Sequence, residues 1–127
     1  MSELFKFRTN FSASHFYHSD ELSTEENQNT FGLCSNQNGH GHDYAAVFVF
    51  QASLEDREQV EKKLKDWVFN TYEHKSLNHE VKAFKGVPTT ELLAKHFFEE
   101  STRLGVDTKQ VALFESDFVG AVYPADF

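Results

Sequence analysis

The sequence has little of what marks secreted and membrane proteins. It contains a single cysteine, Cys34, so no disulfide can form within the chain. Its first ten residues, MSELFKFRTN, include no apolar signal segment, and no stretch approaches the roughly 18 apolar residues of a membrane span. We therefore expect a soluble, cytoplasmic protein that does not enter membranes. The lone thiol is then either buried filler or a reactive group.

Positive charge is also scarce. The chain carries 12 lysine and arginine residues against 20 aspartate and glutamate residues, which gives a formal net charge of −8. Such a surface repels phosphate backbones, so we expect no nucleic-acid partner. A phosphorylated substrate would need a local positive site to overcome this field.

No repeat, low-complexity tract or linker divides the chain, and we expect residues 1–127 to form one domain. Hydrophobic residues make up 39 % of the sequence, with 14 phenylalanines among them. This is enough apolar mass for a folded core, so the composition argues against disorder.

Hydrophobic periodicity predicts four strands and two helices. The expected strands are residues 4–15, 40–50, 111–116 and 119–123, and the expected helices are 54–72, capped by Ser53, and a second that opens at Pro88 and Thr89 and stops at Gly105. The second helix is expected to turn Leu92, Leu93, Phe97 and Leu104 inward. The polar stretch 19–29 has no apolar period and is expected to be an exposed loop. This order predicts an α+β fold, a four-stranded antiparallel sheet with both helices on one face.

Histidines stand at the ends of the two strands that begin the chain. His40 and His42 are two apart in a strand, so both side chains point the same way, roughly 7 Å apart. His15 ends the first strand, and antiparallel pairing would bring it beside the start of the second. Three neutral imidazoles with an open fourth position are typical of a catalytic zinc site. The sequence therefore predicts a Zn²⁺ site made by these three residues.

Cys34 allows two interpretations. It lies six residues before His40, across a flexible polar turn. As a fourth zinc ligand it would close the shell and make a stabilising site without chemistry. As a thiolate beside the metal, with its pKa lowered by the positive charge, it would be ready to take a proton. The spacing alone leaves both open.

Other polar residues lack such partners in the sequence. His18 and His79 fall in polar loops and His96 on a helix, and we expect all three to be solvated or capping histidines. Taken alone, Glu115 is an ordinary exposed strand glutamate.

Five motifs together resemble one protein family. They stand in family order and span most of the chain: FSASH (11–15), FGLCSNQNGHGHDY (31–44), EHKSLN (73–78), PTTE (88–91) and FES (114–116). The chain resembles 6-pyruvoyl-tetrahydropterin synthase and its relative, the 6-carboxy-tetrahydropterin synthase of the queuosine pathway. The resemblance implies the tunnelling fold, in which subunits join their sheets into a barrel. It also implies a hexamer of two trimers with active sites at subunit interfaces.

The resemblance also implies roles for residues at the matching positions. His15, His40 and His42 match the three zinc ligands, and Cys34 matches the general base. His74, preceded by Glu73, matches the histidine of a second proton-transfer pair. Glu115 matches the glutamate that anchors the pterin ring, whose adjacent N–H donors a carboxylate can accept. Thr89, Thr90 and Glu91 match the segment that lines the pterin pocket.

The implied substrate is 7,8-dihydroneopterin triphosphate, which would lose triphosphate to give 6-pyruvoyl-tetrahydropterin. The 6-carboxy enzyme acts on the same substrate and is the alternative. Five residues separate Cys34 from His40, as in the pyruvoyl synthase, whereas the queuosine enzyme typically has three. A third interpretation is a zinc-bearing or pterin-binding protein without turnover, in which Cys34 is the fourth ligand.

Two positions depart from the family pattern. The family usually has aspartate where this chain has Glu73, so the carboxylate is one methylene longer. After Phe50 the segment QASLED leads almost directly into the expected helix, which predicts a shorter hairpin and a shorter sheet at that end.

Overall fold

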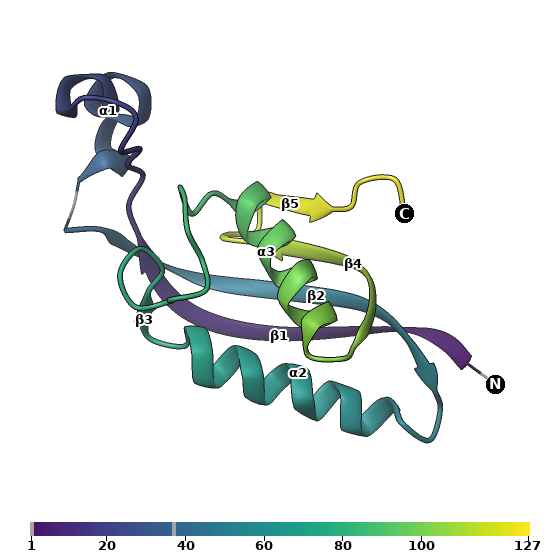
Figure 1. The fold of residues 1–127 in the computed structure, drawn as a ribbon. Helices are drawn as coiled ribbons and strands as arrows, with labels where there is room; N and C mark the ends of the chain where they lie inside the picture. Colours follow the sequence, from purple (N-terminus) through teal and green to yellow (C-terminus); the bar gives the residue numbers. More distant parts are fainter. Residues whose placement is uncertain (1, 37) are drawn as a thin grey trace.

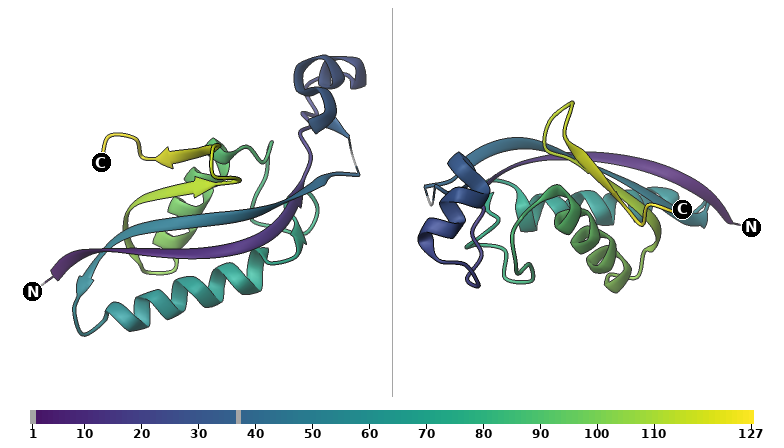
Figure 2. Two further views of the ribbon diagram at one scale, coloured as in Figure 1. Left: turned by 180° about the vertical axis from the view of Figure 1, so that it is seen from behind. Right: turned by 90° about the horizontal axis from the view of Figure 1, so that it is seen from above.

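The computed structural model describes residues 2–36 and 38–127. In chain order the elements are β1 (Ser2–His15), α1 (Thr24–Phe31), the 3-10 helix η1 (Gly32–Ser35), β2 (His40–Ser53), α2 (Arg57–Tyr72), β3 (Lys75–Ser76), α3 (Thr90–Arg103), β4 (Asp107–Phe114) and β5 (Gly120–Tyr123). Helices α2 and α3 cover one face of the sheet, and α1 lies at one end of it (Figures 1 and 2). The predicted α+β class is confirmed. No helix in the described part of the chain has the length and apolar character that a membrane crossing requires.

The sheet has the order β3-β1-β2-β4-β5 and is open at both edges. Strands β1 and β2 pair antiparallel along their whole length, from Ser2 opposite Ser53 to His15 opposite His40. The pairs β2–β4 and β4–β5 are also antiparallel, as predicted. The fifth strand, β3, was not predicted, because its two residues are too short to show a period; it lies parallel to β1 beside Ala13 and Ser14. An open sheet of this kind fits a barrel completed by other subunits.

The core lies between the sheet and the two long helices. Phe11 stacks on Tyr44 with ring centroids 4.9 Å apart, and Phe97 of α3 packs on Tyr72 of α2 at 4.6 Å. All four side chains are at most 2 % exposed. Residues of β1 alternate in burial, as the period of two that predicted this strand requires, and Phe11, Ala13 and His15 lie on its buried face. This aromatic core ends at Tyr44, one step along the same face from the histidines.

The prediction of an exposed loop over residues 19–29 is wrong in part, because residues 24–31 form helix α1. Ser23 and Glu26 form a capping box, in which each side chain accepts a hydrogen bond from the other residue's backbone N–H. Asn27 is 2 % exposed, accepts from the Ser19 N–H and donates to three backbone carbonyls. Capping and one buried amide hold this segment together, which explains why hydrophobic periodicity does not detect it.

Three expectations about the strands and helices need correction. Strand β2 continues to Ser53, three residues beyond its expected end at Phe50. Ser53 therefore ends a strand and does not cap α2, which begins at Arg57; its hydroxyl accepts the Asp56 N–H in the intervening turn. Leu92 and Leu104 are 45 % and 38 % exposed, because they lie beside the buried stripe of Leu93 and Phe97 and not within it. The predicted start of α3 at Thr89 and its stop at Gly105, with a φ of 94°, are confirmed.

Candidate functional site

Three histidines meet at the end of the β1–β2 ladder. The register places His15 directly opposite His40, and His42 lies opposite Ala13 on the same face. One ring nitrogen from each residue lies within 4.8 Å of the others, and the Nε2 atoms of His15 and His40 are 2.9 Å apart. Pairing of the two strands thus gathers the three imidazoles, as their spacing predicted.

The chemistry of this histidine group fits a metal ion. His15 is 1 % exposed, and burial, followed by the nearby His40 and His42, lowers its pKa to about 4. It is therefore neutral at pH 7, which is the form that binds a metal. The Tyr44 hydroxyl lies 2.6 Å from His15 Nδ1, the nitrogen that faces away from His40. Such an outer partner fixes the ring orientation and the tautomer of a metal-binding histidine.

Glu115 faces the same group from the segment that follows β4. Its Oε2 atom lies 4.0 Å from His15 Nε2 and 3.9 Å from His42 Nε2. The contact with His15 is not an ion pair at neutral pH, because the lowered pKa leaves His15 uncharged. Among the described residues this buried oxygen has no hydrogen-bond partner. Glu115 is thus not an ordinary exposed glutamate, and its free oxygen is available to a ligand that donates N–H groups or to a bound cation.

Cys34 lies near the histidine group without belonging to it. It sits half-buried in η1, and its backbone carbonyl accepts a hydrogen bond of 2.6 Å from the Tyr17 N–H. The Tyr17 ring packs against His15 with centroids 4.9 Å apart. Burial, followed by the charges of Glu115, Cys34 and Glu91, raises the pKa of Tyr17 to about 12. Tyr17 therefore connects the thiol-bearing segment to the end of β1.

The predicted pair Glu73 and His74 lies at the C-terminal end of α2, against the opposite side of β1 from β2. The Ser12 N–H donates to Glu73 Oε1, and the His74 N–H donates to the Ser12 carbonyl, each over 2.6 Å. The Glu73 carboxylate thus reaches past His74 to the strand backbone. His74 itself is exposed and has a φ of 57°, an unusual value for a residue with a side chain.

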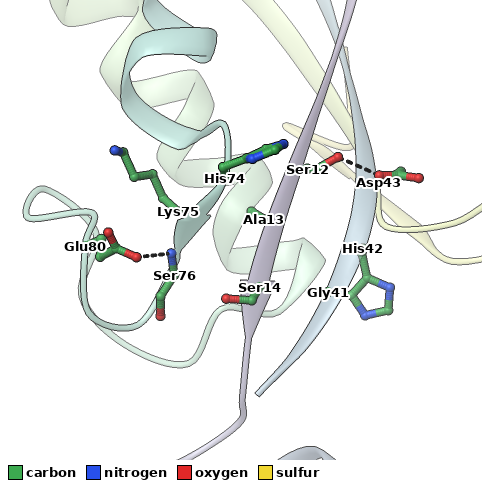
Figure 3. Close-up of a pocket in the computed structure, with 10 residues that line it drawn as sticks. All are labelled: Ser12, Ala13, Ser14, Gly41, His42, Asp43, His74, Lys75, Ser76 and Glu80. Atoms are coloured by element: carbon green, nitrogen blue, oxygen red, sulfur yellow. Dashed lines mark hydrogen bonds between the residues drawn. The ribbon is translucent and has the colours of Figure 1, made fainter. Parts of the chain in front are cut away.

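His74 lines a surface cavity of about 430 Å³ that includes Ser12, His42, Asp43 and Lys75 (Figure 3). The close-up shows the His74 ring beside Ser12, whereas His42 projects from β2 away from it. Within the residues the structure describes, no hydrogen bond joins His74 to Cys34 or to the histidine group. A single chain therefore places the Glu73–His74 pair and the histidine group in the same region, with no hydrogen bond between them among the described residues.

The segment 89–91 has mixed surroundings. The Thr89 hydroxyl accepts the Leu92 N–H as the cap of α3. Thr90 is 4 % exposed, so its side chain belongs to the packed interior. Glu91 is exposed, and its charge is among those that act on the pKa of Tyr17. Of the three residues, Glu91 is thus the one that carries a charge, and this charge acts on Tyr17, which packs against His15.

The expectation for the remaining histidines holds for two of them. His79 is exposed, and His18 lies 3.3 Å from the Asp20 carboxylate at the surface. The expectation for His96 is wrong: it is 9 % exposed and its Nε2 lies 2.7 Å from the Tyr72 hydroxyl. It falls on the stripe of α3 that contains Leu93 and Phe97, a position that helical spacing could have identified.

Sequence reasoning missed two tyrosines at the site. Tyr44 follows His42 by two residues and so shares its strand face, a signal that was present in the sequence. Tyr17 lies beyond the end of β1, where no period operates, and only the folded chain shows its contact with His15.

The fold and the site together define an α+β protein with a candidate metal centre at one end of an open sheet. Comparison with known proteins makes this specific: the sequence pattern of 6-pyruvoyl tetrahydropterin synthase matches residues 5–126, and the chain belongs to this family.

Relatives cover nearly the whole chain. The 6-pyruvoyl tetrahydrobiopterin synthases of Pongo abelii and Homo sapiens are 34 % and 32 % identical to it, each over 94 % of this chain and 89 % of their own length. The solved structure of Caenorhabditis elegans 6-pyruvoyl tetrahydropterin synthase matches with a TM-score of 0.86 at 29 % identity, over 97 % of this chain and 95 % of that one. The Plasmodium falciparum synthase, with a TM-score of 0.59 and 13 % identity over 95 % of this chain and 96 % of its own, shows likeness of fold alone.

The histidine group predicts that substitution of a proposed ligand and substitution of the neighbouring thiol affect the metal content differently. The purified protein should carry about one metal ion per chain, and His15→Ala should lose most of it because one of three ligands is gone. Cys34→Ala should keep its metal, since the thiol is not in the group. Elemental analysis of the two variants after identical purification gives the comparison. Full retention in His15→Ala would remove that residue from the site.

The contact between the Tyr44 hydroxyl and His15 predicts a loss of metal affinity that is smaller than the loss caused by removing a ligand. Tyr44→Phe keeps the ring in the core but removes the hydroxyl that holds His15 Nδ1. Metal affinity should fall by about 10- to 100-fold, the usual consequence of losing an outer-shell partner. Competition with a chelator of known affinity measures it, with circular dichroism as the control for folding. An unchanged affinity would show that Tyr44 does not orient the ligand.

Proposed function

We propose that the chain is a zinc-dependent 6-pyruvoyl-tetrahydropterin synthase. It would act as a lyase that converts 7,8-dihydroneopterin triphosphate to 6-pyruvoyl-tetrahydropterin with elimination of triphosphate. One observation carries the proposal: three imidazoles, of which His15 is neutral, and a buried carboxylate oxygen with no partner among the described residues converge at one point in a chain of this family.

His15, His40 and His42 would hold the metal. Imidazole suits zinc among other transition metals, and three such ligands leave a position for substrate. When bound, Zn²⁺ would supply Lewis-acid polarisation of the substrate's side-chain hydroxyls and so acidify the adjacent C–H bonds. The low pKa of His15 means that a ligand nitrogen is free of its proton at neutral pH.

The protein's own residues would then bind the pterin and move protons. Glu115 would accept hydrogen bonds from the amino-pyrimidine edge with the oxygen that has no partner among the described residues. Cys34, on η1 beside the histidine group, would act as a general base on the side chain. His74, with Glu73 tied to Ser12, would form the second proton-transfer pair. Thr89, Thr90 and Glu91 would line the pterin pocket, with Glu91 the member whose charge acts on Tyr17.

The site would be completed by a second subunit. In one chain His74 is exposed and makes no described contact with Cys34, and the sheet is open at both edges. Edge pairing between subunits would bury such edges. A hexamer of two trimers, with sites at subunit interfaces, is the assembly that we propose. The expected cytoplasmic location stays a prediction.

The 6-carboxy-tetrahydropterin synthase reaction is the second candidate. It starts from the same substrate and ends in a carboxylate with loss of acetaldehyde. The five residues between Cys34 and His40 and the names of the relatives favour the pyruvoyl product. A zinc- or pterin-binding protein without turnover is disfavoured by the position of Cys34 outside the histidine group.

The assembly has its own test. Light scattering of the purified protein at assay concentration should report a trimer or hexamer, and activity should follow that species. A fully active monomer would contradict a site shared between subunits.

The reaction is tested by identifying the product. The protein should convert dihydroneopterin triphosphate to the pyruvoyl compound and release triphosphate, as followed by mass spectrometry. Cys34→Ala should bind metal and substrate but lose on the order of 10² to 10⁴ in rate, the usual contribution of one general base. Formation of the carboxy compound would identify the protein as a 6-carboxy-tetrahydropterin synthase. A complete lack of turnover would favour a zinc- or pterin-binding protein without catalytic activity.

A further inference from the structure

A buried hydrogen bond connects the two long helices close to the proposed site. The hydroxyl of Tyr72, the last residue of α2, lies 2.7 Å from Nε2 of His96 in the middle of α3. The two side chains are 1 % and 9 % exposed. Within the described part of the chain this is the one buried polar contact between these helices. None of the roles proposed above uses either residue.

Both groups are neutral at physiological pH. Burial lowers the pKa of His96, against an opposing effect of Glu100 and Glu99 and together with a smaller effect of Arg103. Burial also raises the pKa of Tyr72 well above its usual range. The hydroxyl therefore keeps its proton and can donate it to the imidazole nitrogen. A buried bond of this kind has a fixed length and direction, so it restricts the Tyr72 ring more tightly than apolar packing does.

The residues that follow Tyr72 are the proposed proton-transfer pair. Glu73 accepts from the Ser12 N–H, and the His74 N–H donates to the Ser12 carbonyl. His74 has a positive φ, a conformation that costs free energy in a residue with a side chain and persists only when its surroundings hold it. Ser12 holds this turn from β1, and Tyr72 holds it from the helix side.

His96 also contacts the chain on the other side of this turn. Its ring lies edge-on to Phe84, with centroids 5.2 Å apart, and Phe84 is buried in the loop that follows β3. The segment from Glu73 to Ser76 thus lies between two residues, Tyr72 and Phe84, that both pack on His96. A single side chain of α3 thus contacts both the residue before the turn that presents His74 and a buried residue of the loop after β3.

We propose that Tyr72 and His96 are positioning residues for the Glu73–His74 pair: their hydrogen bond sets the place of the α2 terminus and so the geometry of the proton-transfer groups. The expected effect on the reaction rate rests on the proposed function. The expected effect on the structure of the turn does not depend on that function. Neither residue needs to touch the substrate.

The test compares two substitutions that each remove one buried hydroxyl. Tyr72→Phe removes the bond to His96 and keeps the ring. Thr108→Val is the matched control, because Thr108 is 6 % exposed and bonds the fully buried Ser101 over 2.7 Å at a place remote from the turn. Both changes should lower the melting temperature by a similar amount.

Only Tyr72→Phe should change the reaction. Its kcat should fall by about 10- to 100-fold, because a displacement of the proton-transfer groups by about 1 Å can slow a reaction by that much. KM and metal content should stay unchanged. Thr108→Val should keep the native kcat. Of the variants at His96, His96→Gln, which keeps an acceptor for the hydroxyl, should retain more of the kcat than His96→Leu.

Hydrogen exchange in the intact assembly separates this inference from the proposed function. The amides of His74 and Leu77, which bond to Ser12 and Ser14, should exchange faster in Tyr72→Phe and at the native rate in Thr108→Val. This result would support the positioning role even if the protein formed no pterin product. Equal exchange of these amides in both variants, or equal kcat in both where the native protein is active, would overturn it.

Discussion

The antiparallel pairing of β1 with β2 is the constraint on which the site depends. Each strand has 14 residues, and the ladder runs unbroken from Ser2 opposite Ser53 to His15 opposite His40. A shift of one residue would turn His40 and His42 to the other face and separate them from His15. The aromatic pair Phe11 and Tyr44 stabilises this register from within the core. Folding of the sheet and assembly of the proposed metal ligands are therefore one event.

The transition from core to site occurs along one face of this ladder. Tyr44 places its ring in the core and its hydroxyl on His15, so it belongs to both. Beyond it the inner face changes from phenyl rings to imidazoles, and the Oε2 atom of Glu115 lies beside them. Burial keeps His15 neutral, which lowers the cost of binding a cation. The same packing that stabilises the fold thus prepares the ligands.

Much of this could be predicted from the sequence, because strands and helices with a strong apolar period reveal their inner faces. The four longer strands, the two long helices and the meeting of the three histidines follow from periods of two and 3.6 and from strand order. Helix α1 could not be found in this way, since a capping box and the buried amide of Asn27 hold it. The burial of His96 follows from its helical spacing to Leu93 and Phe97, whereas that of the Glu115 carboxylate oxygen depends on its packing against the histidine group, which a single sequence does not state. The place of Cys34 outside the histidine group likewise depends on the short helix η1, which no apolar period predicts.

We propose that His15, His40 and His42 form the metal shell and leave Cys34 free for chemistry. X-ray absorption spectroscopy of the zinc-loaded protein tests this most directly, because sulfur and nitrogen neighbours scatter differently. We expect nitrogen and oxygen neighbours at about 2.0–2.1 Å, with additional scattering from the more distant atoms of the imidazole rings and no sulfur. A sulfur neighbour at about 2.3 Å would make Cys34 a ligand and would contradict its role as a base.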